Sequence, residues 1–80
     1  MQVAVTGLLR AAVNGAASIS VEAATIRELL NKLVDRYPKF EALLDSDVAV
    51  AINGEIFRDN WSEPIPRDAE VVLMPRIQGG

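Results

Sequence analysis

The stretch Thr25-Ile-Arg-Glu-Leu-Leu-Asn-Lys-Leu-Val-Asp-Arg-Tyr-Pro38 decides the fold of this chain. Thr25 and Glu28 have the spacing of a capping box, in which each side chain pairs with a free backbone N–H at the start of a helix. Pro38 ends that helix at or just before Tyr37. Apolar residues recur at steps of three and four, so they share one stripe of the helix: Ile26, Leu29, Leu30, Leu33, Val34 and Tyr37. The stretch predicts one amphipathic helix that lies on a sheet.

Strand patterns stand on both sides of this helix. They are rich in Val, Ile and Leu, and the segment before the helix alternates polar and apolar residues with a period of two. Gly7 interrupts the first pattern and is expected to form a bulge or bend. The expected strands cover residues 2–9, 18–22, 48–52, 55–58 and 71–74.

The segments between these patterns carry turn and loop signals. Asn14-Gly15 and Asn53-Gly54 are typical of hairpin turns. Residues 40–44 predict one further helical turn after the main helix. Residues 59–68 hold two prolines and predict a loop, in which Trp61 seals the edge of the core.

The order of the elements is strand, strand, helix, strand, strand, strand. A single helix between an early hairpin and later strands is typical of a crossover packed on a mixed sheet. We therefore expect an α+β fold of the β-grasp (ubiquitin-like) class, a mixed sheet with one main helix packed across it. Residues 1–75 form this domain, and residues 76–80 form a flexible C-terminal tail that ends in Gly-Gly.

The composition excludes several classes of function. The chain has 80 residues, no cysteine and no histidine, so it lacks a thiolate nucleophile, a disulfide framework and the commonest metal ligands. Eight scattered basic residues against eleven acidic ones give a net charge of −3, which argues against nucleic acid as a partner. No apolar run reaches the about 20 residues that span a bilayer. Without a signal-peptide pattern, a cytoplasmic location away from membranes is expected.

The carboxylates do not form a convincing catalytic pair. Asp45 and Asp47 precede one expected strand, and Asp68 and Glu70 precede the last one. Because Asp favours turns and capping positions, we interpret all four as turn residues exposed to solvent. The chain is therefore not expected to be an enzyme.

The last residues, Met74-Pro-Arg-Ile-Gln-Gly-Gly80, need a functional explanation. Glycines have no Cβ atom, so Gly79 and Gly80 can pass through a channel too narrow for other residues. The carboxylate of Gly80 then becomes the reactive group. A protein of this kind is a substrate activated by another protein.

In this light the whole chain resembles the MoaD/ThiS family of ubiquitin-like sulfur carriers. The resemblance rests on residues 25–30, 48–55, 65–71 and the ending 74–80. It implies that an E1-like adenylating enzyme uses ATP and magnesium to activate Gly80, and that a sulfur donor converts the adenylate to a thiocarboxylate. The chain itself would bind no cofactor. The sulfur would then pass to an acceptor synthase that makes molybdopterin, thiamin, cysteine or a thiolated tRNA base.

Two other functions remain open. The chain could be a ubiquitin-like modifier conjugated to lysines through Gly80, or a non-catalytic small docking subunit of a larger enzyme such as molybdopterin synthase. The molybdopterin-type ending usually has proline where this chain has Arg76 and a small residue where it has Gln78. These differences weaken the assignment to molybdopterin synthase in particular.

Partners are expected to contact the tail and the sheet face that the helix leaves open. Alternation puts Val71 and Leu73 on one side of the last strand and Val72 and Met74 on the other, and it does not tell which side meets the helix. Charge reversal at Arg76 is expected to weaken docking more than folding, because tails contribute little to a core. The candidate partner-binding residues are Gly79, Gln78, Ile77, Arg76, Met74 and Val72.

Overall fold

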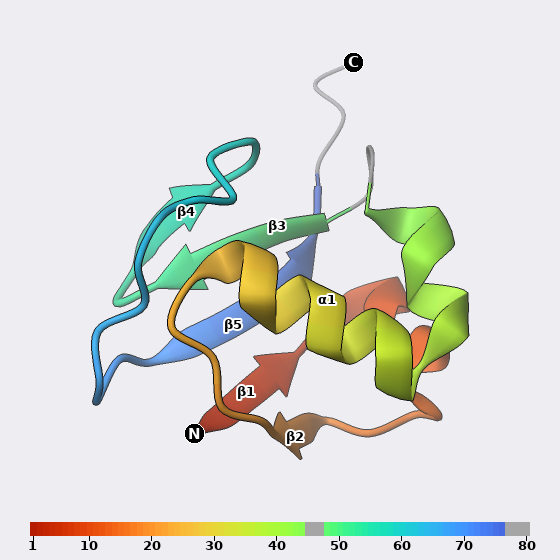
Figure 1. The fold of residues 1–80 in the computed structure, drawn as a ribbon. Coiled ribbons are helices and arrows are strands. Elements are labelled where there is room, and N and C mark those ends of the chain that lie inside the picture. The colour runs from red at the N-terminus through yellow and green to blue at the C-terminus, as the bar shows by residue number, and fades with distance from the viewer. Residues whose placement is uncertain (45–47, 77–80) are drawn as a thin grey trace.

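The structure is a computed structural model that describes residues 1–44 and 48–76. The strands and the one main helix follow one another in the predicted order (Figure 1). One short 3₁₀ helix lies between the first two strands, and a second follows the main helix. The elements are β1 (Gln2–Val5), η1 (Gly7–Val13), β2 (Ser18–Ser20), α1 (Ile26–Arg36), η2 (Pro38–Leu43), β3 (Val48–Ile52), β4 (Glu55–Phe57) and β5 (Val71–Pro75).

The strands form one five-stranded sheet in the order β2-β1-β5-β3-β4. β1 and β5 are parallel, and the pairs β1–β2, β3–β4 and β3–β5 are antiparallel. The last strand thus lies between the first strand and the third, and α1 lies across one face of the sheet (Figure 1). This arrangement confirms the mixed β-grasp sheet with one main helix.

The start of α1 confirms the capping box with one change of partner. The Thr25 hydroxyl accepts a hydrogen bond from the backbone N–H of Glu28 at 3.2 Å. The Glu28 carboxylate accepts one at 2.6 Å from the N–H of Ala24, one residue before the position that the motif predicts. Both capping side chains act within the first turn of the helix, which explains why the start of α1 could be located from sequence.

The loop after β4 also caps α1. The carbonyl of Glu63 accepts from the N–H of Ile26 at 3.1 Å, and the carbonyl of Trp61 accepts from the N–H of Arg27 at 2.7 Å. Because the first N–H groups of a helix have no partner within the helix, this loop fixes where α1 begins. Trp61 is half-buried and packs against the core, as predicted.

The core lies between α1 and the face of the sheet that α1 covers. Four of the six residues in the predicted stripe are buried, whereas Val34 and Tyr37 are half-buried at its margin. Phe40 in η2 is fully buried and closes one end of the core, which confirms the further helical turn. The largest fully buried side chains come from η1, α1, η2 and the central strands.

The first strand is shorter than predicted. β1 ends at Val5, and η1 begins at Gly7, where the expected strand continues to residue 9. Gly7 has φ +60°, a left-handed conformation that ends a strand and that glycine adopts without a Cβ penalty. The apolar residues Leu9 and Val13 are still buried, but they reach the core from a helical turn.

Both Asn-Gly pairs turn the chain through left-handed φ values, but only Asn53-Gly54 forms a hairpin turn. Asn14, with φ +59°, instead ends η1. Asn53 and Gly54 have φ values of +51° and +87°, as a tight hairpin between β3 and β4 requires. Asn53 also pairs with Glu70, donating its N–H to the Glu70 carbonyl at 2.9 Å and accepting from the Glu70 N–H through its side chain at 2.9 Å. The turn therefore positions the start of β5.

Candidate functional site

Three of the predicted site residues lie in the part of the chain that the structure describes. Val72 and Met74 belong to β5, and Arg76 follows its last residue. The other four, Ile77, Gln78, Gly79 and Gly80, lie outside the described residues, as do Asp45 and Asp47. Within the described residues, the candidate site consists of the open sheet face and of Pro75 and Arg76, which precede the C-terminal glycines.

The structure decides which side of β5 faces away from the helix. Val71 and Leu73 are 1% and 0% exposed and belong to the core, so they face α1. Val72 and Met74 are half-buried and lie on the opposite face. Val72 and Met74 therefore lie on the face that α1 leaves open, and they form the candidate contact patch.

Strand pairing extends this patch into an apolar surface. Val72 pairs with Ala4 and Ala51, Met74 pairs with Ala49, and Ala51 pairs with Ile56. Ile56 is 51% exposed and, with Leu8, is one of two exposed large hydrophobic residues in the described part of the chain. We call these residues the open face: Ala4, Ala49, Ala51, Ile56, Val72 and Met74.

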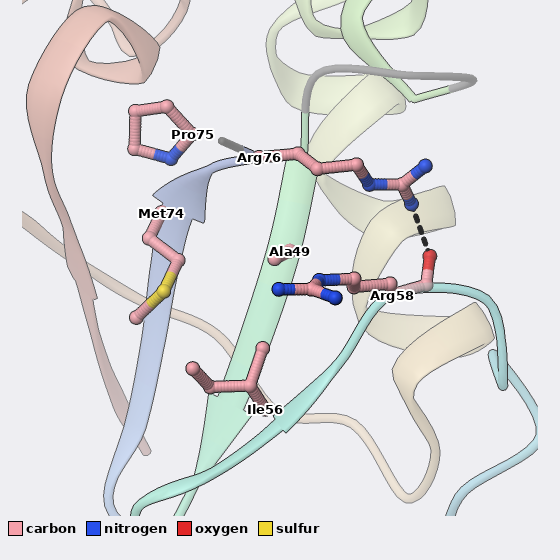
Figure 2. A pocket seen from close by; sticks show the side chains of 6 residues that line it. All are labelled: Ala49, Ile56, Arg58, Met74, Pro75 and Arg76. Carbon is pink, nitrogen blue, oxygen red and sulfur yellow. Dashed lines mark hydrogen bonds between the residues drawn. The ribbon is translucent and has the colours of Figure 1, made fainter. Parts of the chain in front are cut away.

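A small hollow lies at the end of the open face that adjoins the C-terminal segment (Figure 2). Its floor is Ala49, and its walls come from Ile56, Arg58, Met74, Pro75 and Arg76. Its volume of ≈ 60 Å³ is well below the about 300–1,000 Å³ of a small-molecule site. The hollow is therefore too small for a small-molecule ligand and has room for about one side chain.

Arg76 ties the end of β5 to the neighbouring strands. Its guanidinium reaches across β3, where its Nη2 atom donates to the carbonyl oxygen of Arg58 (Figure 2) and to that of Val48 at 3.4 Å. The same atom lies 3.6 Å from a carboxylate oxygen of Asp59, whose side chain is 92% exposed. The Arg76 side chain is only 17% exposed. Arg76 therefore makes contacts within the domain, in addition to its expected role in docking.

A second contact holds the root of the segment from the other side. A Cβ atom built on Gly7 would lie 2.6 Å from the Cγ atom of Pro75 and 3.1 Å from its Cδ atom. Thr6 precedes this contact and donates to the Leu73 carbonyl from both its N–H and its hydroxyl, each at 3.0 Å. Pro75 is thus fixed between the end of β1 and the start of β3, with which it pairs at Val48.

The end of the sheet carries a second, larger hollow. Leu8, Leu9 and Leu43 line it together with Pro75 and Arg76, and its volume is ≈ 270 Å³. Leu8 is 86% exposed. Sequence reasoning missed this apolar end, because it assigned Leu8 to a strand.

The remaining acidic residues behave as turn residues. Asp68 and Glu70 are exposed, and Asp68 lies in the turn from Pro66 to Ala69, which is closed by a hydrogen bond from the Ala69 N–H to the Pro66 carbonyl at 3.1 Å. Across residues 1–44 and 48–76 there is no group of three His, Cys, Asp or Glu side chains that could hold a metal ion. Within the same ranges, no helix has the length and apolar character needed to cross a membrane.

Solved structures with the same architecture define the class of this protein. CysO in the Amycolatopsis orientalis BexX/CysO complex is 21% identical with a TM-score of 0.80, covering 99% of this chain and 98% of its own. SAMP1 from Haloferax volcanii is 24% identical with a TM-score of 0.76, covering 99% of this chain and 97% of its own. A putative molybdopterin converting factor, subunit 1, from Pyrococcus furiosus is 23% identical with a TM-score of 0.79 and covers 95% of each chain. The fold is that of ubiquitin-like β-grasp proteins.

A sequence comparison narrows the class to a family. The sequence model of the ThiS family matches residues 3–80, almost the full chain. The protein belongs to the ThiS family, and thus to the ThiS/MoaD-like sulfur carriers with the ubiquitin fold. No curated protein sequence matches the chain.

Proposed function

We propose that this protein carries sulfur on the C-terminal carboxylate of Gly80. The observation that carries the proposal is the ThiS-family match, which extends through both glycines to residue 80. In the first step, a carboxylate oxygen attacks the α-phosphorus of ATP on an E1-like enzyme that uses magnesium. Pyrophosphate leaves, and the acyl-adenylate of Gly80 remains.

A sulfur donor completes the loading reaction. Sulfide attacks the acyl carbon, AMP leaves, and a thiocarboxylate remains on Gly80. With a persulfide donor the first product is an acyl disulfide, and a thiol then cleaves its S–S bond to release the thiocarboxylate. A carboxylate is a poor electrophile, so adenylation is needed to provide a leaving group. We place this ATP-dependent chemistry in the cytoplasm.

The carrier contributes position and not a catalytic side chain. The contacts of Pro75 with Gly7 and of Arg76 with Val48 hold the two residues that directly precede residues 77–80. A fixed starting point reduces the conformational freedom that is lost when the segment enters an enzyme channel. We propose that Val72 and Met74 dock the domain, and that Arg76, Ile77, Gln78 and Gly79 contact the channel.

Pyrophosphate exchange tests this proposal directly. Purified E1-like enzymes are incubated with the protein, ATP and labelled pyrophosphate, and label in ATP is measured. Wild type should support exchange, and the chain without Gly80 should not. Arg67→Ala is the matched control, because Arg67 is exposed in the loop before β5. Exchange that persists without Gly80 would overturn the proposal.

A second function has support from one structural relative. The small archaeal modifier protein 1 from Methanosarcina acetivorans is 22% identical with a TM-score of 0.77, and its name describes a protein modifier. The same adenylate would then be attacked by a lysine amine in place of sulfur. Lysine conjugates that vanish when Gly80 is deleted would favour this function. We also propose a further protein partner. It is either the synthase that accepts the sulfur or a larger subunit on which the carrier docks.

A further inference from the structure

Two arginines stand at one end of the open face, although the chain as a whole is acidic; the Asp59 carboxylate lies 3.6 Å from one of them, Arg76. The strand residues on this side of the sheet carry no carboxylate. They are the six apolar residues of the open face together with Gln2, Ser18 and Ser20. Two guanidinium groups, those of Arg58 and Arg76, stand at the end where the C-terminal segment begins (Figure 2). The chain as a whole has a net charge of −3. The cationic end of the open face is therefore a local feature.

The two arginines have different roles. Arg76 is only 17% exposed, and its guanidinium is engaged by the Val48 and Arg58 carbonyls and by Asp59. Arg58 is exposed, and its side chain makes no hydrogen bond or ion pair with any residue that the structure describes. In Figure 2 the Arg58 side chain extends over Ala49 toward the hollow. Its backbone is held by Arg76 while its guanidinium remains available.

We infer that the open face recognises a carboxylate on the adenylating enzyme, and that Arg58 is the residue that binds it. This inference rests on the proposed function. A guanidinium can pair with a carboxylate through two parallel hydrogen bonds, which fixes orientation as well as adding affinity. Ile56 and Met74 flank Arg58 at the hollow and would exclude water from the pair. Arginine beside apolar side chains is a common composition for an energetically important contact.

The surroundings favour a protein carboxylate over nucleic acid. Phosphate backbones are bound by extended rows of cations, whereas this face offers one free guanidinium among apolar residues. The ≈ 60 Å³ hollow accommodates a side chain next to that guanidinium. The expected partner surface is therefore apolar and carries an Asp or Glu side chain.

Steady-state kinetics with an E1-like enzyme that adenylates the wild type tests the inference. Truncating one member of a buried ion pair weakens binding by at least about 10-fold, so Arg58→Ala should raise the KM for the carrier by that factor. The kcat should not change, because Arg58 is remote from the reacting carboxylate in sequence and acts in docking. Arg58→Lys keeps the charge without the planar fork and should lose less. Raising the ionic strength should increase the KM of wild type more than that of Arg58→Ala.

Arg27→Ala is the matched control, since Arg27 is an exposed arginine of α1 on the other side of the sheet. Its KM should equal that of wild type. Melting temperatures of all variants should stay within about 3 °C of wild type, since exposed side chains without partners contribute little to stability. A wild-type KM for Arg58→Ala, with wild type still adenylated, would overturn this inference alone. Failure of every enzyme to adenylate the wild type would overturn the proposed function, and this inference with it.

Discussion

Gly7 and Pro75 touch so closely that no side chain fits between them: a Cβ atom on Gly7 would lie 2.6 Å from the Pro75 ring. The end of β1 and the end of β5 are therefore packed against each other directly before the segment that carries Gly80. This contact relates the fold to the proposed function, because it sets where the reactive segment starts.

The first prediction concerns Gly7→Ala. The left-handed φ of +60° and the overlap with Pro75 should together destabilise the protein by about 2–3 kcal/mol. Gly54→Ala is the matched control, because Gly54 has φ +87° but has no atom within 4 Å of a Cβ. It should cost only the backbone strain, about 1 kcal/mol. Urea unfolding followed by the fluorescence of Trp61 measures both values. Equal losses for the two variants would show that the Pro75 contact has no energetic weight.

The second prediction concerns Arg76→Ala. Removal of the guanidinium leaves the Val48 carbonyl without the hydrogen bond that Arg76 donates, and should cost about 1–3 kcal/mol of unfolding free energy. Arg67→Ala removes an exposed arginine and should change stability by less than about 0.5 kcal/mol. Urea unfolding measures the free energy of unfolding of both variants. If Arg76→Ala unfolds like Arg67→Ala, the contacts across β3 do not stabilise the domain.

The third prediction compares the two large apolar side chains that are exposed. Ile56 is 51% exposed on the open face, and Leu8 is 86% exposed at the end of the sheet. If docking uses the open face, Ile56→Asp should raise the KM for the carrier in pyrophosphate exchange by about 10-fold or more, as for a buried interface anchor. Leu8→Asp should leave the KM near that of wild type. The reverse order would place docking at the hollow lined by Leu8 and Leu43.

The fourth prediction concerns acid stability. The α-ammonium of Met1 donates to the Glu22 carboxylate at 2.5 Å, and this hydrogen bond, followed by the attraction of the same charge, lowers the pKa of Glu22 from its ordinary value of 4.5. A lowered pKa in the folded state adds stability at neutral pH, and that stability is lost as the pH falls through the folded pKa. Glu22→Gln should therefore be less stable than wild type at pH 7, and the difference should vanish in strong acid. Because Glu22 is fully exposed, added salt should also reduce it. A difference that does not depend on pH would contradict this role.

Local signals in the sequence predicted most of the fold. The capping residues Thr25 and Glu28, the stop at Pro38 and the Asn53-Gly54 turn act through neighbours within a few positions, so their effects could be read without the tertiary structure. With α1 and the hairpin located, the mixed sheet followed from the order of the elements.

Long-range contacts explain what sequence reasoning missed. The early end of β1 depends on Gly7 meeting Pro75 at the far end of the chain. Arg76 returns to the sheet because backbone carbonyls of β3 and of the residue after β4 accept its hydrogen bonds, and no sequence pattern marks such acceptors. The direction of Val72 was undetermined because both faces of β5 are apolar, so only the position of α1 could decide it.

Sulfur transfer by this protein requires that Gly80 accepts sulfur as a thiocarboxylate. Intact mass spectrometry tests it most directly, after incubation of the protein with an E1-like enzyme, ATP, magnesium and a sulfide or persulfide donor. A thiocarboxylate on Gly80 should give a mass increase equal to the replacement of one oxygen by one sulfur, located at Gly80 by fragmentation and absent without ATP. An unchanged mass, under conditions where the same enzyme adenylates the protein, would contradict the carrier function. The modifier function would then be the better explanation of the Gly79-Gly80 ending.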